Sequence, residues 1–212
     1  MKLNCFGRKS FVPALGILAL CLGAQTLRAD LAFRQTNLVS DIPGLARFTD
    51  PNLANPWGIA FGPTSPFWVA DNHTGVATLY NGSGAKIPLT VTVPAPGGGT
   101  SAPTGQIFNG TTDFNGDRFI FSSEDGTITG WRGALGTTAE TLSLGSAGSI
   151  YKGLAIGNTG GFNYLYATDF HNNNIDVLPV FLMPCSLPPA QYINDPAATF
   201  VTLPSTEISP VP

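Results

Sequence analysis

The feature that most constrains this sequence is a pattern of residues that occurs three times at a nearly constant interval. Gly58, Gly105 and Gly153 occupy equivalent places in the three copies, 47 and 48 residues apart. An interval of roughly 40 to 50 residues is typical of one four-stranded blade of a β-propeller. The interval therefore predicts a row of similar β-sheets, with a β-sandwich of coincidental spacing as the alternative.

Each copy is predicted to consist of strands, because its apolar runs are short, rich in Ile, Val, Phe, Tyr and Thr, and separated by Gly, Pro, Asn and Asp. The expected strands are 58–61, 67–70, 76–80 and 87–93, then 106–108, 118–122, 127–131 and 141–144, then 154–156, 164–168 and 174–177. The third copy has no convincing fourth strand. The dipeptides Asn115-Gly116 and Asp125-Gly126 predict tight hairpins.

The repeat predicts an all-β fold, a partial β-propeller of about three four-stranded blades. The three aligned glycines fit this fold, because the first strands of propeller blades crowd the central axis and only a residue without Cβ lets their backbones approach closely. The expected boundaries are 30–177 for the partial propeller and about 55–93, 102–144 and 151–177 for its blades.

Three blades are fewer than the roughly four to eight of most propellers, so two blade edges stay open. The chain is then either a fragment or closes these edges by self-association. Residues 33–40 are expected to form a strand that joins the last blade and closes the ring. The Gly-rich segment 94–103 is expected to be a flexible connector between blades.

Residues 1–29 have the organisation of a signal peptide. Lys2, Arg8 and Lys9 precede an apolar run, and Ala29 provides a small residue before cleavage ahead of residue 30. We therefore expect a secreted protein, extracellular or periplasmic, with no stable membrane span after cleavage. A retained membrane anchor and a lipoprotein that begins at Cys21 are the alternatives.

The composition after cleavage argues against two classes of protein. Loss of residues 1–29 leaves 6 of the 10 basic side chains and all 13 acidic ones, a formal charge of −7. Nucleic acid is therefore not an expected partner, because phosphate binding needs clustered Lys and Arg. Cys185 is then the only cysteine, which excludes an internal disulfide.

The composition changes abruptly after Val177. Residues 178–212 contain no Gly, Lys or Arg, but they hold 8 of the 18 prolines. This density excludes a central strand and disfavours a helix. The segment is either a Pro-rich irregular linker or a tail that is out of frame with the fold.

Several strings resemble a family of secreted bacterial proteins of uncharacterised function: "NLVSDIPGLARFTDPNLANPWGIAFGP", "SPFWVADNHTGVATLYN", "SAPTGQIFNGT", "FIFSSEDGTITGW" and "YATDFHNNNIDV". The resemblance covers about residues 33–177 and implies an NHL-like β-propeller, of which only the N-terminal half is present. Members often carry a C-terminal PEP-CTERM sorting signal. The sequence departs from the family after Val177, and no such signal is visible.

The two histidines of the chain both occur in an Asp-x-His sequence between the second and third strands of a copy. The candidate metal ligands are Asp71, His73, Asp169 and His171, with Glu124 and Asp125 on the corresponding turn of the middle copy. Imidazole and carboxylate suit Zn²⁺ or another divalent ion. However, turns at mid-radius are far apart for one ion, and Asp commonly closes turns by accepting backbone hydrogen bonds. We therefore favour a structural turn and predict no cofactor, with a divalent metal as the alternative.

No catalytic residue is predicted. The expected role is a binding or scaffold module for an extracellular polysaccharide or protein, and the alternative is a fragment of a metal-dependent, lactonase-like hydrolase. The residues before the aligned glycines, Trp57, Thr104 and Lys152, are expected to form no common ligand ring. Trp57, Trp68 and Trp131 could stack on sugars, but their regular place in strands favours core packing.

We expect His73→Ala and His171→Ala each to change thermal stability little, because a turn of this kind depends on the Asp rather than on the His. Thermal unfolding and metal analysis of the purified variants test this. Loss of a bound metal in either variant would contradict the turn interpretation.

Overall fold

The computed structural model describes residues 34–179. The chain divides into a unit of Met1–Gln35, of which only the last two residues are described, and a compact unit of Thr36–Pro212. Strands dominate the described residues, which contain two short 3-10 turns, η1 (Phe114–Gly116) and η2 (Gly133–Leu135), and no α-helix. No helix among them is long and apolar enough to cross a membrane.

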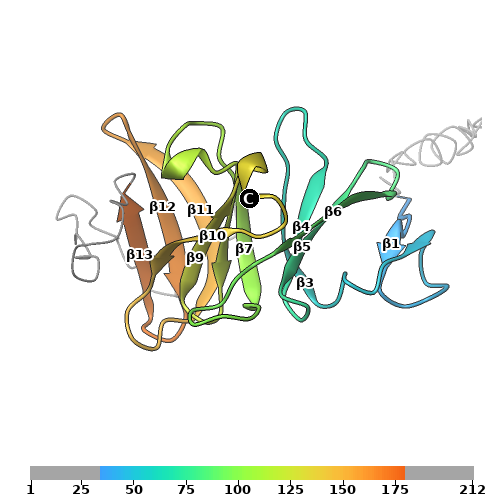
Figure 1. The fold of residues 1–212 in the computed structure, drawn as a ribbon, viewed down its shortest axis with the longest axis horizontal. Helices are drawn as coiled ribbons and strands as arrows, with labels where there is room; N and C mark the ends of the chain where they lie inside the picture. The colour runs from blue at the N-terminus through green and yellow to red at the C-terminus, as the bar shows by residue number, and fades with distance from the viewer. Residues whose placement is uncertain (1–33, 180–212) are drawn as a thin grey trace, which may run out of the picture. The chain divides into compact units, whose positions relative to one another are not determined.

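Three antiparallel sheets follow one another in chain order (Figure 1). The first sheet contains β3 (Pro56–Ala60), β4 (Phe67–Asp71), β5 (Val76–Tyr80) and β6 (Lys86–Thr92). The second sheet contains β7 (Pro103–Phe108), β8 (Phe119–Ser123), β9 (Thr127–Trp131) and β10 (Glu140–Leu144). The third sheet contains β11 (Tyr151–Thr159), β12 (Phe162–Asp169) and β13 (Asn174–Pro179). Each strand pairs with the next one along the chain, as hairpin connections require.

The predicted strands of all three copies are confirmed, with ends that differ by a few residues. The largest difference is β11, which covers Tyr151–Thr159 where only 154–156 was expected. Of the two expected hairpins, Asp125-Gly126 connects β8 to β9 as predicted, and Gly126 has a φ of 77°. Asn115-Gly116 lies instead in η1, inside the long loop between β7 and β8, so the prediction of a tight hairpin there is wrong.

Two segments outside the three antiparallel sheets also differ from expectation. In the stretch 33–40, β1 (Val39–Ser40) pairs in parallel with the nearby β2 (Phe48–Thr49), and not with the third sheet. The segment 94–103 forms a turn closed by backbone hydrogen bonds from Ala95 N to Gly99 O, 3.2 Å, and from Ser101 N to Val93 O, 2.8 Å. This segment therefore has defined backbone partners where a flexible connector was expected. Of the tail expected at 178–212, Leu178 and Pro179 form the end of β13, and the residues from 180 onward lie outside the described part of the chain.

The sheets pack face to face, and the second sheet is buried on both faces. A stacked pair, Trp68 and Phe119 with ring centroids 4.2 Å apart, lies at the centre of the first interface. Its other buried members are Ala60, Ala70, Ala77, Leu79, Val91, Val93, Phe121 and Ala139. The interface between the second and third sheets buries Phe114, Ile120, Ile128, Tyr151, Leu165, Ala167 and Leu178. Neighbouring residues of a strand face opposite sides of the sheet, so all five residues of β8 are buried, and its first three are consecutively apolar.

The first strands of the sheets, β3, β7 and β11, lie side by side at very short range. A Cβ atom at Gly58 would lie 2.6 Å from the carbonyl oxygen of Thr104, and one at Gly105 would lie 2.4 Å from the amide nitrogen of Leu154. The expectation that these glycines permit close backbone approach is therefore confirmed. At Gly153 the nearest atom is Thr168 Oγ1, at 3.1 Å in the same sheet, because no following sheet is present among the described residues.

We expect Gly105→Ala to lower the free energy of unfolding by about 1–3 kcal/mol, the usual cost of overpacking, because the new methyl group displaces the backbone of β11. Gly110→Ala is the matched control, since a Cβ at Gly110 meets only Phe108 Cε1 at 3.5 Å, an ordinary contact. Denaturant unfolding of both variants measures the difference. Equal stability of the two variants would contradict the close approach of β7 and β11.

Candidate functional site

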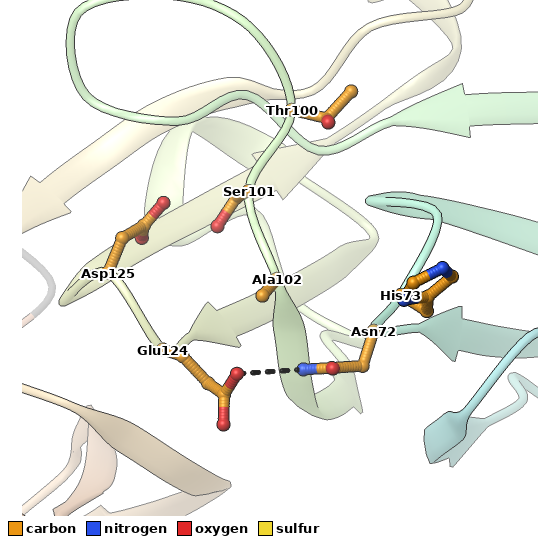
Figure 2. Close-up of a pocket in the computed structure, with 7 residues that line it drawn as sticks. All are labelled: Asn72, His73, Thr100, Ser101, Ala102, Glu124 and Asp125. Atoms are coloured by element: carbon orange, nitrogen blue, oxygen red, sulfur yellow. Dashed lines mark hydrogen bonds between the residues drawn. The ribbon is translucent and has the colours of Figure 1, made fainter.

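A polar pocket of about 530 Å³ lies where the turn after β4, the segment before β7 and the turn after β8 meet (Figure 2). Its lining combines an amide, an imidazole, two hydroxyls and two carboxylates with one small apolar side chain. These residues are Asn72, His73, Thr100, Ser101, Ala102, Glu124 and Asp125. The pocket therefore uses turns of the first and second sheets that the strand order brings to the same end.

Glu124 connects all three sheets at this pocket. Its Oε2 accepts a hydrogen bond from Asn72 Nδ2 at 3.4 Å (Figure 2), and its Oε1 forms an ion pair with Lys152 of β11. The hydrogen bond from Lys152 is the main cause that holds the pKa of Glu124 below its usual value. Glu124 is therefore an ionised acceptor at neutral pH, with its charge offset by the neighbouring ammonium group.

Lys152 also lies over the ring of Trp57, with its Nζ atom 4.9 Å from the ring centroid. Trp57 is 47% exposed, so the expectation that all three tryptophans pack in the core is wrong for this one. Trp68 is buried and Trp131 packs partly buried against the same core, as expected. Trp57 differs because it lies where the register of β3 shifts between Pro56 and Gly58, and its ring faces Lys152 of the third sheet.

The three residues before the aligned glycines do not form a ring, but two of them meet. Trp57 and Lys152 form the cation–π contact across the end of the second sheet. Thr104 is separate from them, because it is buried and donates a hydrogen bond to the carbonyl oxygen of Tyr151 at 2.8 Å. The middle sheet instead contributes Glu124, from the turn after β8, to this contact.

Ser101 is the most buried polar residue of the pocket. It is 7% exposed, and its Oγ atom has no hydrogen-bond partner among the residues that the structure describes. In Figure 2 the hydroxyl points to the space between Asp125 and Glu124. An unpaired buried hydroxyl is unfavourable, so this atom is positioned to bond something that enters the pocket.

Asp125 has one occupied and one available carboxylate oxygen. Its Oδ1 closes the turn after β8 by accepting hydrogen bonds from the backbone N–H of Thr127 at 3.1 Å and from the Thr127 hydroxyl at 2.5 Å. Its Oδ2 accepts no hydrogen bond from any residue in the range 34–179. His73 is exposed at the rim of the pocket, and its ring forms no hydrogen bond within the same range.

The Asp and the His of the first Asp-x-His sequence lie in different environments, one buried and one exposed. Asp71 ends β4 and is fully buried on the face of the first sheet opposite Ala70, where its Oδ2 accepts a hydrogen bond from Thr78 Oγ1 at 2.7 Å. Burial raises the pKa of Asp71 to about 7. His73 instead lines the pocket, so this Asp and this His do not share a ligand site.

The second Asp-x-His sequence is a closed turn. Asp169 is buried and its Oδ1 accepts hydrogen bonds from the backbone N–H groups of Ile150 at 3.1 Å and Asn172 at 3.2 Å. Burial acts to raise the pKa of Asp169, but hydrogen bonds from Ser149 and Asn172 outweigh it and lower the pKa. His171 is exposed beside Gly148. Within the described part of the chain no three His, Cys, Asp or Glu side chains gather as metal ligands would.

The sequence-based search missed Ser101, Asn72 and the role of Lys152. Ser101 belongs to a segment that composition marks as a linker, and no local pattern shows that its hydroxyl becomes buried. The only available signal was position, because Asn72 and Glu124 both follow the second strand of their copies.

We expect Asp71→Asn to stabilise the protein increasingly as the pH rises from about 4 to 7. In this window the folded chain keeps the proton of Asp71 and the unfolded chain releases it, so the wild type loses stability as the pH rises. Asparagine stays neutral and still accepts the Thr78 hydrogen bond. The measurement is the Tm difference between variant and wild type at several pH values.

Asp41→Asn, which removes an exposed carboxylate, is the matched control for the loss of charge. A Tm difference for Asp71→Asn that is the same at pH 4 and pH 7 would show that Asp71 is ionised in the folded protein.

The chain is similar in sequence to two proteins of a giant virus. No protein-family model matches the chain. "Uncharacterized protein R648" of Acanthamoeba polyphaga mimivirus is 33% identical over 181 residues, which cover 79% of this chain and 44% of that protein. "Uncharacterized protein L690" of the same virus is 30% identical over 162 residues, which cover 71% of this chain and 42% of that protein. The chain thus spans less than half the length of these curated relatives.

Among solved structures, a chain of "Crystal structure of BBS1N in complex with ARL6DN, soaked with mercury" matches 58% of this chain and 36% of its own length. The TM-score is 0.43 and the identity is 17%.

The predicted resemblance to a family of secreted bacterial NHL-like proteins is wrong, because the curated proteins that this chain matches are viral.

Proposed function

We propose that this chain is part of an exported β-propeller that binds an extracellular ligand at the end of the sheets where Asn72, Glu124 and Lys152 meet. The observation that carries the proposal is that three successive sheets contribute side chains to one polar site, which also contains an unpartnered buried hydroxyl, Ser101 Oγ. Loops at one end of stacked sheets are a common place for binding sites on a rigid scaffold.

Two observations support a propeller with further blades. The first strands approach each other closely at Gly58 and Gly105, as blades do around an axis. The chain also spans only 44% of the length of a relative that it matches over most of its own length. Three sheets in less than half of such a protein leave length for a closed ring of a size that propellers have.

The outer faces of the first and third sheets support the same proposal. In the first sheet, Ile59 of β3 and Phe61, which directly follows this strand, are 64% and 63% exposed. On β13 Ile175 is 40% exposed. Exposed apolar rows of this kind usually mark an interface. We propose that neighbouring blades of the longer protein cover them, with self-association through the open edges as the alternative.

The electrostatics of the site favour binding over hydrolysis. A general base works best when its pKa lies near the operating pH, whereas Lys152 lowers the pKa of Glu124. Asp71 has a pKa near 7, but it is fully buried beside Thr78 and away from the pocket. The carboxylates of the site are therefore suited to accept hydrogen bonds from a ligand.

Export is part of the proposal because the pattern at residues 1–29 has the charge, length and small residue of a cleaved signal peptide. These residues lie outside the described part of the chain. The ligand is accordingly an extracellular polysaccharide or protein.

The proposal is tested by thermal unfolding of the full chain with four probe classes: neutral oligosaccharides, oligouronates, spermidine with oligolysine, and Ca²⁺ or Zn²⁺. A ligand that binds the folded state raises Tm with its concentration, and we expect one class to do so. Gluconolactone hydrolysis, with and without the metals, is measured in parallel. Turnover of the lactone would favour the hydrolase alternative, and no Tm response to any class would contradict the binding role.

A further inference from the structure

We propose that the pocket between the first and second sheets binds the hydroxyl groups of a neutral saccharide, with Ser101, Asp125 and His73 as its contact residues. This inference rests on the proposed binding function and specifies its ligand class. The supporting observation is that several polar groups lining the pocket have no hydrogen-bond partner among the described residues.

The first step is the buried hydroxyl of Ser101. Ser101 is only 7% exposed, and its Oγ has no hydrogen-bond partner within residues 34–179. Burial without a hydrogen bond is costly, and the cost disappears when a ligand group supplies the bond. A hydroxyl can both donate and accept, so its best match is a group that does the same.

The second step is the set of acceptors and donors beside it. Asp125 Oδ2 is an available acceptor, while its Oδ1 is held in place by two hydrogen bonds from Thr127. A carboxylate fixed in this way is oriented before the ligand arrives, which reduces the ordering cost of binding. The exposed His73 ring offers one donor and one acceptor when it is neutral. Such a mixture suits vicinal sugar hydroxyls.

The third step is charge. The ion pair with Lys152 offsets the charge of Glu124, so Asp125 is the one carboxylate of the lining without a basic partner among the described residues. This single negative charge disfavours phosphate or uronate ligands. It is also too little for a divalent cation, which takes about six to eight oxygen ligands in the case of Ca²⁺. The unpaired hydroxyl of Ser101 can both donate and accept a hydrogen bond, so it favours a neutral ligand rich in hydroxyl groups over an organic cation, which offers donors only.

The fourth step is size and surroundings. The pocket has a volume of about 530 Å³ and is largely open to solvent, so a ligand longer than one sugar residue can extend beyond it. Trp57 is exposed next to Lys152, which bonds the pocket residue Glu124. The Trp57 ring offers an apolar surface beside the polar pocket. A chain of several sugar residues can therefore form hydrogen bonds in the pocket and stack on this ring.

The experiment is a calorimetric titration of the full chain with maltohexaose, cellohexaose, laminarihexaose and chitohexaose. We expect at least one to bind, and Ser101→Ala and Asp125→Asn each to weaken its affinity about fivefold or more through loss of one hydrogen bond. Asparagine keeps the Oδ1 acceptor for the Thr127 turn. Ser101→Ala should not lower Tm without ligand, because it removes a buried hydroxyl that has no partner.

The matched controls are Ser143→Ala and Asp41→Asn, which make the same chemical changes outside the pocket and should leave the affinity unchanged. Saccharide binding that neither pocket variant weakens would overturn the assignment to this pocket and leave the binding function standing. If no oligosaccharide binds but another probe class raises Tm, the ligand class is wrong and the binding function stands. If no probe of any class binds, both proposals fail.

Discussion

The close approach of the first strands is the constraint on which the rest of this structure depends. A Cβ atom at Gly58 or at Gly105 would collide with the backbone of the next sheet, at 2.6 Å and 2.4 Å. With glycine at both places, β3, β7 and β11 lie side by side, and each sheet covers a face of the next. The stacked Trp68 and Phe119 and the rest of both cores follow from this spacing.

The polar site is a consequence of the same arrangement. Each sheet ends its second strand on the same side, so the turns after β4 and β8 face each other, and the start of β11 brings Lys152 to Glu124. The first sheet also bonds the second at its outer edge, from Thr92 N to Thr137 O at 2.8 Å and from Ala139 N to Thr92 O at 2.9 Å. The backbone hydrogen bonds at the outer edge and the close approach at the glycines of the first strands together fix the positions of the pocket residues.

Carboxylates in this fold are used in two ways. Asp169 and Asp125 accept backbone hydrogen bonds and close turns. Asp117 is buried against Gly130, where a Cβ would lie 2.1 Å from its Oδ2, and it pairs with Arg132 at 2.9 Å. Burial nevertheless raises the pKa of Asp117 to about 6, as it does more strongly for Asp71. A protein with few charged side chains thus places several of them inside, where the balance between burial and hydrogen bonding decides their ionisation.

The sequence by itself determined the strands, their order and the need for glycine at two first strands, because strand periodicity and glycine are local properties. It also located the turns that hold Asp125 and Asp169. It could not decide which turn residues meet. The Asn72–Glu124–Lys152 contact joins residues that are 52 and 28 positions apart, and the burial of Ser101 depends on how two sheets pack. Those contacts arise only from tertiary structure, since no local pattern encodes a distance between segments that are remote in the chain.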